Sequence, residues 1–445
     1  MAKRSRRKRI PTDIITAKVT QLNHEGRGIA HVNAKATFLF AALPGETVNF
    51  QYTKCHRQYD EGTVVEVLEK SNDRVTPRCP HFGVCGGCSM QHISSDTQRM
   101  HKQAVLLEHF QHQANCQPET IMEPLSANAW EYRRRARLSV RFVPKKDAVL
   151  VGFRERGTSF VAKLDACEIL HPAIGRKIKA LGELFMQCEM KSHIAQIEVA
   201  IGDNAAAIVI RHMVELPQID IDKLIHFARD NDLHLYFQPK GPNTIHPIFP
   251  ENPDELFYEI PDHQIKMVFK PSQFTQINQA INLKMINRAL ELLDLQKTDR
   301  ALDLFCGIGN FSLPMAKYCG AVVGVEGAEN SIIQAQKNAI ANDIQNVSFY
   351  TQDLLADLSQ AVWSKDRYDK VLLDPARVGA KELMPHIAVW QPERIVYVSC
   401  NPITLARDSK ALLALGYRLD KAGVMDMFPQ TDHIEAIALF VRDCV

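Results

Sequence analysis

The chain has 445 residues, of which 46% are hydrophobic and 23% are charged, and its formal net charge at pH 7 is +2. This length predicts about two to four domains of an ordinary soluble globular protein. No apolar run reaches the roughly 18 residues of a membrane-spanning helix, and no apolar segment follows the charged N-terminus as in a signal peptide. We therefore expect a cytoplasmic protein without membrane contact.

Basic residues gather at the N-terminus and again near residue 135. The tail contains Lys3, Arg4, Arg6, Arg7, Lys8 and Arg9, and the second cluster contains Arg133, Arg134, Arg135 and Arg137. Each cluster alone is equally consistent with a solvated surface. Phosphate binding depends on such clusters more than on net charge, so the pattern favours nucleic acid as a partner.

The N-terminal third contains two distinct regions. Residues 12–70 alternate short apolar stretches with turns at Gly26, Gly28 and Pro44-Gly45, which predicts a small β-barrel. Residues 71–92 are rich in Cys, Gly and Pro. A helix is expected at about 94–114.

Cysteine usage indicates metal binding and catalysis rather than disulfides. The count of 11 is odd, and a long chain without an export signal does not need a disulfide framework. Cys79, Cys85 and Cys88 form a C-x5-C-x2-C pattern. Spacing alone leaves an iron–sulfur cluster and zinc as equal alternatives, with His81 or His92 able to complete a zinc site.

In the remaining chain, the predicted pattern of strands and helices changes at about residue 275. Residues 130–260 mix helices with two predicted hairpins, at 133–156 and 195–212. Beyond them, short apolar strands at 300–305, 321–326, 346–353, 368–376 and 394–400 mostly alternate with helical patterns, and 432–443 reads as a last strand. This order predicts a parallel, doubly wound α/β sheet.

The first of these strands leads into a nucleoside-type motif. Cys306-Gly307-Ile308-Gly309-Asn310 follows it, and the second strand ends in Glu326. The glycines permit a tight turn and close ligand approach, and Glu326 is placed to accept hydrogen bonds from a ribose. The third strand ends in Asp353, which suits an adenine amino group or caps a helix. The absent third glycine argues against a dinucleotide.

Two candidate reactive residues follow the next strands. Asp374 ends the fourth and Cys400 the fifth, where Asn401-Pro402 turns the chain. Ligands of open α/β sheets bind at this edge. A thiolate there can add to carbon 6 of uracil and make carbon 5 nucleophilic, after which a base removes the carbon 5 proton. Glu435, on the last strand, is the candidate base. A uracil inside folded RNA must lie in a loop or be flipped out to reach it.

Five segments together resemble the uracil-5 RNA methyltransferase family. They are PSQFTQIN, DLFCGIGNFS, LLDPAR, VSCNP and HIEAIALF, between residues 271 and 441. The barrel resembles a TRAM RNA-binding domain, and CPHFGVCGGCSMQH resembles the iron–sulfur segment of the ribosomal members. The combination is most similar to members that act on 23S ribosomal RNA.

The resemblance implies a role for each matched residue. Cys400 corresponds to the nucleophile and Glu435 to the general base. The S-adenosylmethionine contacts correspond to Gln276, Phe305, Asn310, Glu326, Asp353 and Asp374. Cys79, Cys85, Cys88 and, as fourth ligand, Cys167 correspond to the ligands of a 4Fe–4S cluster.

The expected organisation has three parts. Residues 1–73 form the basic tail and the OB-like TRAM barrel, 74–268 an α+β iron–sulfur domain that binds RNA, and 269–445 a class I Rossmann-like methyltransferase domain. The helix near 94–114 is expected to pack on the catalytic domain. We expect a monomer.

Three alternatives are weighed against this interpretation. A 5-methylcytosine enzyme would carry Pro-Cys at the fourth strand, where this chain has Asp374-Pro375. A uracil in another RNA, such as tRNA, is a second possible substrate. A non-catalytic RNA-binding or ribosome assembly protein is the third, and the presence of both Cys400 and Glu435 speaks against it.

Overall fold

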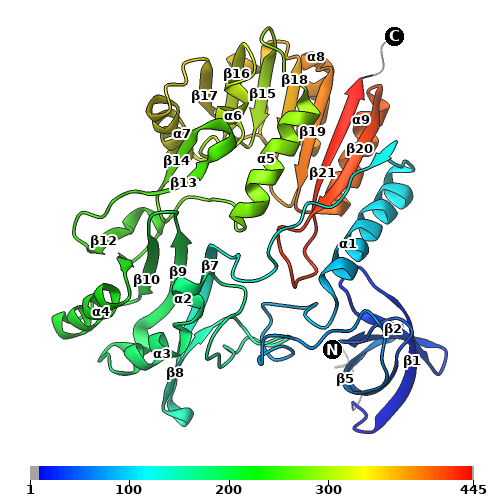
Figure 1. The fold of residues 1–445 in the computed structure, drawn as a ribbon, viewed down its shortest axis with the longest axis vertical. Coiled ribbons are helices and arrows are strands. Elements are labelled where there is room, and N and C mark those ends of the chain that lie inside the picture. The colour runs from blue at the N-terminus through cyan, green and yellow to red at the C-terminus, as the bar shows by residue number, and fades with distance from the viewer. Residues whose placement is uncertain (1–9, 443–445) are drawn as a thin grey trace, which may run out of the picture. The chain divides into compact units, whose positions relative to one another are not determined.

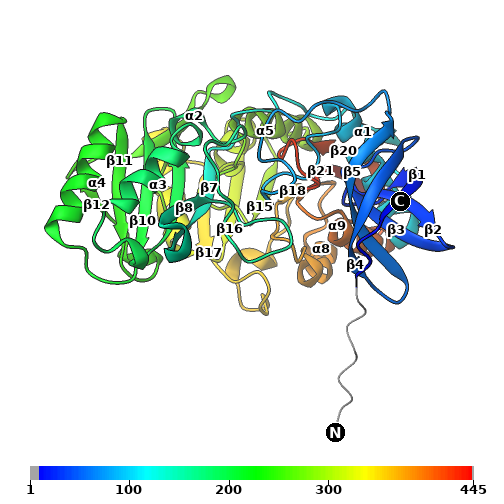
Figure 2. The same cartoon turned by 90° about the horizontal axis from the view of Figure 1, so that it is seen from below.

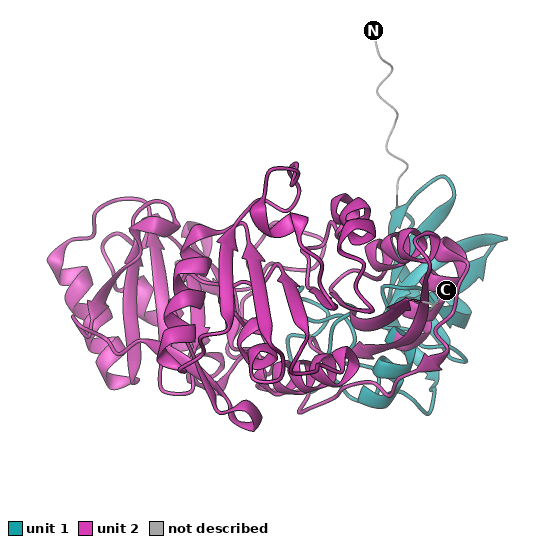
Figure 3. Ribbon diagram, turned by 90° about the horizontal axis from the view of Figure 1, so that it is seen from above, with its two compact units in different colours: residues 1–102, 429–433 teal, residues 103–428, 434–445 magenta. Residues whose placement is uncertain are grey.

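The computed structural model describes residues 10–442, so the basic tail at residues 3–9 lies outside the described part. The chain divides into two compact units (Figure 3). Unit 1 comprises residues 1–102 and 429–433, and unit 2 comprises residues 103–428 and 434–445. The three-domain division expected from the sequence stays a prediction.

Unit 1 contains the predicted barrel, which is closed by five strands in the order β1-β2-β3-β5-β4 (Figure 2). The strands are β1 (Ile14–Leu22), β2 (Gly28–Val32), β3 (Lys35–Phe40), β4 (Thr47–Cys55) and β5 (Tyr59–Glu69). Inward-facing side chains such as Val19, Leu39, Val48 and Phe50 form its core. A Cβ at Gly62 would lie 2.6 Å from the Phe50 ring, so the close approach of β5 requires glycine.

A buried ion pair fastens the end of the barrel to the segment that follows it. Arg74 donates from Nε and Nη2 to the two carboxylate oxygens of Glu46, at 2.5 and 2.7 Å. Burial raises the pKa of Glu46, but the hydrogen bonds from Arg74, Leu43 and Ser71 outweigh it and lower the pKa overall. Because a buried carboxylate without partners is costly, this pair specifies how the chain leaves the barrel.

The first half of unit 2 contains the predicted α+β region, whose six-stranded sheet has the order β12-β11-β10-β9-β7-β8. Both expected hairpins form, since β7 pairs with β8 and β9 with β10 in antiparallel register. The strands are β7 (Arg135–Val143), β8 (Ala148–Gly152), β9 (Ile194–Ile201), β10 (Ala206–His212), β11 (Leu233–Gln238) and β12 (His246–Phe249). The helices are α2 (Pro172–Gly175), α3 (Ile178–Met186) and α4 (Gln218–Asp230). A separate hairpin of β13 (Leu256–Ile260) and β14 (Ile265–Phe269) follows.

The second half of unit 2 is built on an eight-stranded sheet in the order β17-β16-β15-β18-β19-β21-β20-β6 (Figure 1). The predicted strands are β15 (Arg300–Leu304), β16 (Ala321–Glu326), β17 (Val347–Thr351), β18 (Lys370–Leu373), β19 (Arg394–Ser399) and β21 (Glu435–Arg442). The strands β15 to β19 are parallel, whereas β21 is antiparallel to both of its neighbours. Two further strands, β6 (Thr120–Ile121) and β20 (Tyr417–Met425), were not expected.

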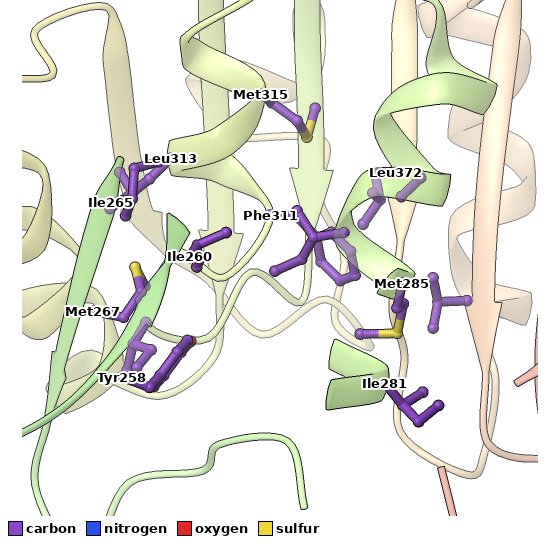
Figure 4. Packing of buried hydrophobic residues seen from close by; sticks show 14 of the residues in the cluster. Tyr258, Ile260, Ile265, Met267, Ile281, Met285, Phe311, Leu313, Met315 and Leu372 are labelled. Atoms are coloured by element: carbon purple, nitrogen blue, oxygen red, sulfur yellow. The ribbon is translucent and has the colours of Figure 1, made fainter. Parts of the chain in front are cut away.

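Helices cover both faces of this sheet. They are α5 (Gln279–Leu293), α6 (Ser312–Ala316), α7 (Glu329–Ala341), α8 (Met384–Trp390) and α9 (Pro402–Ala414). On one face α5 and the β13–β14 hairpin pack against Leu372 and its neighbours (Figure 4). The opposite core includes Val105, Leu106 and Phe110, so the helical stretch of α1 (Ser95–His109) and the π-helix η1 (Phe110–Ala114) packs on the catalytic sheet in the expected way.

Short 3-10 helices complete the fold. They are η2 (Pro144–Lys146), η3 (Lys191–His193), η4 (Pro242–Thr244), η5 (Pro261–His263), η6 (Val362–Lys365) and η7 (Lys381–Leu383). Within residues 10–442, every helix is too short or too polar to cross a membrane.

Candidate active site

The turn after β15 carries the glycine-containing motif. Phe305, Gly307 and Gly309 have φ values of 66°, 55° and 93°. Glycine adopts this left-handed region without strain, but a phenylalanine does not, and strained residues of this kind cluster at functional sites. The amide of Gly309 donates to the Cys306 carbonyl at 2.9 Å and closes the turn before α6.

Three carboxylates meet where β15, β16 and β18 end. Asp303 is fully buried; one oxygen accepts a hydrogen bond from Ser312 Oγ, and the other has no partner within the described residues. Burial, together with the negative charges of Asp374 and Glu326, raises the pKa of Asp303 to about 7. Burial also raises the pKa of Asp374 to about 7. These three carboxylates, called the acidic cluster below, therefore favour a ligand that brings positive charge and hydrogen-bond donors.

The other two predicted acids are oriented by backbone amides. Glu326 accepts hydrogen bonds from Gly307 at 3.4 Å and from Ala328 at 2.9 Å, which fixes its carboxylate beside the motif turn. Asp353 is exposed and accepts from the amide of Leu355 at 2.9 Å. Asp353 therefore caps a turn, and its second oxygen makes no such contact.

Gln276 and Asn310 belong to a set of polar side chains that also includes Tyr258 and Asn282. The Asn310 side chain accepts from the Tyr258 hydroxyl at 2.8 Å and exchanges hydrogen bonds with Asn282 at 2.9 and 3.0 Å. Gln276, Tyr258 and Asn282 line a cavity of about 10 Å³, which is enough for one water. Since its amide is occupied internally, Asn310 holds the motif turn against the segment that carries Gln276.

Asn338, on α7, ties the same two segments together. Its Nδ2 donates to the carbonyls of Val268 at 3.1 Å and Ile308 at 3.2 Å. Its Oδ1 accepts from the amide of Val268 at 3.0 Å. One buried side chain thus bridges β14 and the motif turn.

Cys400 directly follows β19, and Glu435 is the first residue of the neighbouring strand β21. The antiparallel register pairs Ser399 with Ala436, and its continuation by one residue would place Cys400 opposite Glu435. Both side chains are half-buried. Because β21 begins where the parallel strands end, the predicted nucleophile and base share the edge that carries Asp374.

The charges around Cys400 oppose its ionisation. Burial and the negative charges of Glu435 and Asp374 raise the pKa of the thiol to about 11, and the positive charge of Arg377 acts in the opposite direction. Sequence reasoning did not identify Arg377, although it follows Asp374-Pro375-Ala376 in the LLDPAR motif.

The turn after Cys400 places Arg377 beside it. Asn401 caps α9 by accepting from the amide of Ile403 at 3.1 Å, and Pro402 occupies its first turn. The Nδ2 of Asn401 donates to the Arg377 carbonyl at 3.0 Å, and the Thr404 hydroxyl donates to it at 3.3 Å. The Asn-Pro dipeptide therefore ends β19, starts α9 and holds the Arg377 loop.

The arginine side chains at 133–137 make ion pairs and hydrogen bonds with other residues of unit 2. Arg134 pairs with Asp203, and Arg137 pairs with Glu198 at 3.0 Å. Arg135 donates from Nη2 to the Pro271 carbonyl at 2.9 Å. Phosphate binding by this cluster stays a prediction. The structure adds that it anchors the segment leading to Gln276.

The predicted cluster ligands lie in both units. Cys79, Cys85 and Cys88 belong to unit 1 and Cys167 to unit 2, and none of the four forms a disulfide. Among residues 10–442, no group of three or more His, Cys, Asp or Glu side chains is arranged to hold a metal ion. The amide of Gly87 donates to Cys85 Sγ at 3.4 Å, a contact that stabilises a thiolate.

The arrangement of strands and helices in the second half of unit 2 is the Rossmann-like fold of class I methyltransferases. A solved structure with this fold is that of the Pyrococcus abyssi tRNA (uracil-54, C5)-methyltransferase in complex with S-adenosyl-L-homocysteine. Its TM-score is 0.72 at 21% sequence identity, and the match covers 96% of this chain and 100% of that one.

Sequence comparisons identify the family. Residues 97–443 match the tRNA (Uracil-5-)-methyltransferase model and residues 10–65 the TRAM domain. Proteins named 23S rRNA (uracil(1939)-C(5))-methyltransferase RlmD from Alkalilimnicola ehrlichii and Hahella chejuensis are 46% and 47% identical, over 98% of this chain and 99% of each relative. The chain belongs to the RNA (uracil-5-)-methyltransferase family. The predicted family, the TRAM barrel and the S-adenosylmethionine-dependent methyltransferase class are thereby confirmed.

Proposed function

We propose that this protein methylates carbon 5 of a uracil in 23S ribosomal RNA through a transient bond between Cys400 and carbon 6. One observation supports the mechanism: Ser399, the last residue of β19, pairs with Ala436 of β21, and a continuation of this register by one residue would place Cys400 opposite Glu435. The names of the full-length relatives support the ribosomal substrate, which in turn favours a cytoplasmic location.

The acidic cluster fits S-adenosylmethionine. Asp303 has a buried oxygen without a partner among residues 10–442, and burial together with the charges of Asp374 and Glu326 raises its pKa. A ligand with a sulfonium and an ammonium group relieves that repulsion. Glu326, whose carboxylate accepts from the amides of Gly307 and Ala328, is the proposed acceptor for the ribose. Asp353, Phe305, Gln276 and Asn310 are the further proposed contacts. When bound, S-adenosylmethionine supplies the methyl group that carbon 5 accepts.

The two strand-end side chains carry the rest of the chemistry. The Cys400 thiolate adds to carbon 6 of the uracil and moves electron density to carbon 5. Once carbon 5 carries the methyl group, Glu435 removes its proton. The electron pair of that C–H bond re-forms the double bond between carbons 5 and 6 and expels the Cys400 thiolate. A uracil flipped out of an RNA loop meets this geometry, and the protein acts as a monomer.

The test uses an RNA fragment whose target position is 5-fluorouridine. A base cannot remove the fluorine from carbon 5 as it removes a proton, so the Cys400 thiolate is not released. The wild-type protein with S-adenosylmethionine should therefore form a complex that survives denaturing electrophoresis. Cys400→Ala should abolish the complex. Cys116→Ser, which removes another half-buried thiol of unit 2, should retain it. Survival of the complex in Cys400→Ala would show that the nucleophile is misassigned.

We also propose that the Cys79–Cys88 segment holds a 4Fe–4S cluster, with Cys167 as the predicted fourth ligand. The C-x5-C-x2-C spacing and the amide contact to Cys85 Sγ support it. The purified protein should be brown, and Cys85→Ser should lose the visible absorption that Cys55→Ser keeps. A colourless wild-type protein with stoichiometric zinc would refute iron.

A further inference from the structure

A pocket of about 590 Å³ lies within unit 2, and none of the residues of the acidic cluster lines it. Its walls are the segment 270–273, one face of α7, and the loops on either side of β12; these elements can be located in Figure 1. None of Asp303, Cys400 and Glu435 lines it. Its volume falls within the roughly 300–1,000 Å³ typical of sites for small organic ligands.

The charge of the pocket favours an anion. Lys270, from the 270–273 segment, and Lys337, from α7, both line the pocket and are exposed. Neither makes an ion pair with the residues that the structure describes, and Glu255 is the single acid of the lining. Two available ammonium groups against one carboxylate suit a phosphate.

The remaining lining combines a rigid polar corner with apolar surfaces. Gln273 is buried, donates from Nε2 to the Asn330 carbonyl at 2.9 Å, and accepts from the Lys270 amide at 2.8 Å. This pair of bonds joins the two lysine-bearing walls without using either ammonium group. Apolar side chains also line the pocket, namely Pro242, Ile245, Pro247, Pro271 and Ile333. Such surfaces pack against the face of a base by van der Waals contact.

We infer that this pocket binds a nucleotide of the substrate RNA near the methylated uracil, with its phosphate on Lys270 and Lys337. The pocket is linked to the predicted cofactor site along the chain, because Lys270–Gln273 is followed directly by Phe274, Thr275 and Gln276. Phe274, the first residue after this wall of the pocket, is 70% exposed. The inference rests on the proposed function, since it takes the RNA as the ligand.

The experiment compares two double variants that each remove two exposed lysines. Lys270→Ala/Lys337→Ala changes the pocket, and Lys365→Ala/Lys410→Ala is the control with the same change of charge. Binding of a 23S ribosomal RNA fragment is measured by fluorescence anisotropy at several salt concentrations. The pocket variant should bind about tenfold more weakly, and its slope of log K against log salt should be shallower by about 1.4. The control should match the wild-type protein.

Equal RNA affinity of the two double variants, with unchanged thermal unfolding, would overturn the inference. Uridine monophosphate serves as the probe for a free nucleotide. If the pocket lysines are needed to bind it and the RNA fragment does not displace it, the pocket serves a free nucleotide and the RNA assignment is wrong. Failure of the proposed function has a different signature: the wild-type protein would form no covalent complex with fluorinated RNA, whatever the lysines do.

Discussion

The two halves of the catalytic sheet deliver functional side chains to one edge by opposite routes. In the parallel half, Asp303, Glu326 and Asp374 come from the C-terminal ends of β15, β16 and β18. In the antiparallel extension, Glu435 comes from the N-terminal end of β21. The reversed strand thus brings its first residue to this edge, and Cys400, the proposed nucleophile, follows the end of β19, where the two halves meet.

The halves also differ in how their charges are balanced. In the parallel half the carboxylates repel one another, and a cationic ligand relieves the repulsion. At the junction, burial and the negative charges of Glu435 and Asp374 raise the pKa of Cys400, and the positive charge of Arg377 opposes them. The parallel half is therefore suited to hold the methyl donor, and the junction is suited to keep the thiol protonated until substrate is in place.

Removal of the base should have the largest effect. Glu435→Gln keeps the shape of the side chain but cannot accept the carbon 5 proton. Turnover should fall by about 10²- to 10⁴-fold, and a covalent complex with unmodified RNA should accumulate on denaturing gels. Glu393→Gln, at the opposite end of β19, should retain turnover. Normal turnover in Glu435→Gln would place the base elsewhere.

Asp303→Asn should have the next largest effect, and it should weaken the binding of S-adenosylmethionine at the parallel half of the sheet. Loss of a charge-assisted hydrogen bond of about 1.5–3 kcal/mol corresponds to roughly 10- to 100-fold weaker binding of S-adenosylmethionine. Because the pKa of Asp303 is raised to about 7, the carboxyl is neutral below pH 7, so wild-type affinity should rise between pH 6 and 8. Calorimetry should show a flatter profile in Asp303→Asn. An unchanged affinity would remove Asp303 from the cofactor site.

The smallest effects concern the ionisation of Cys400. Substitution of Glu435 and substitution of Arg377 should shift the pKa of this thiol in opposite directions. With a pKa of about 11, the thiolate fraction grows about tenfold per pH unit below that value, so complex formation with fluorinated RNA should accelerate from pH 7 to 9. Glu435→Gln removes a negative charge and should shift this profile to lower pH. Arg377→Gln removes the positive charge and should slow the reaction at pH 7 by about fivefold, equivalent to about 1 kcal/mol. Shifts of the same sign would contradict this balance of charges.

Much of the fold could be predicted because apolar periodicity and turn residues act locally. The barrel, the two hairpins and the strands β15 to β19 and β21 all follow such signals. Strand β20 was missed because its register shifts between Leu419 and Lys421, where Asp420 and Lys421 interrupt the apolar pattern. β6 has only the two residues Thr120 and Ile121, too few to produce a period.

The candidate site was predictable only where motif and strand end coincide. Cys400, Asp374 and Glu326 fall at such positions. The unpartnered oxygen of Asp303 and the anchoring role of Arg135 depend on tertiary contacts between distant segments, and no spacing reveals them. Placing Cys400 opposite Glu435 needs the strand register, which sequence patterns do not specify across α9 and β20.

The Asn338 bridge has a consequence for how the molecule can be altered. Its amide gives both of its hydrogens to carbonyls, those of Val268 and Ile308, and a carboxylate cannot do this. An aspartate at this position would face two carbonyl oxygens and push apart β14, which leads to the lysine-lined pocket, and the turn after β15. Under the function proposed above, this one substitution on α7 would weaken the binding of both RNA and S-adenosylmethionine.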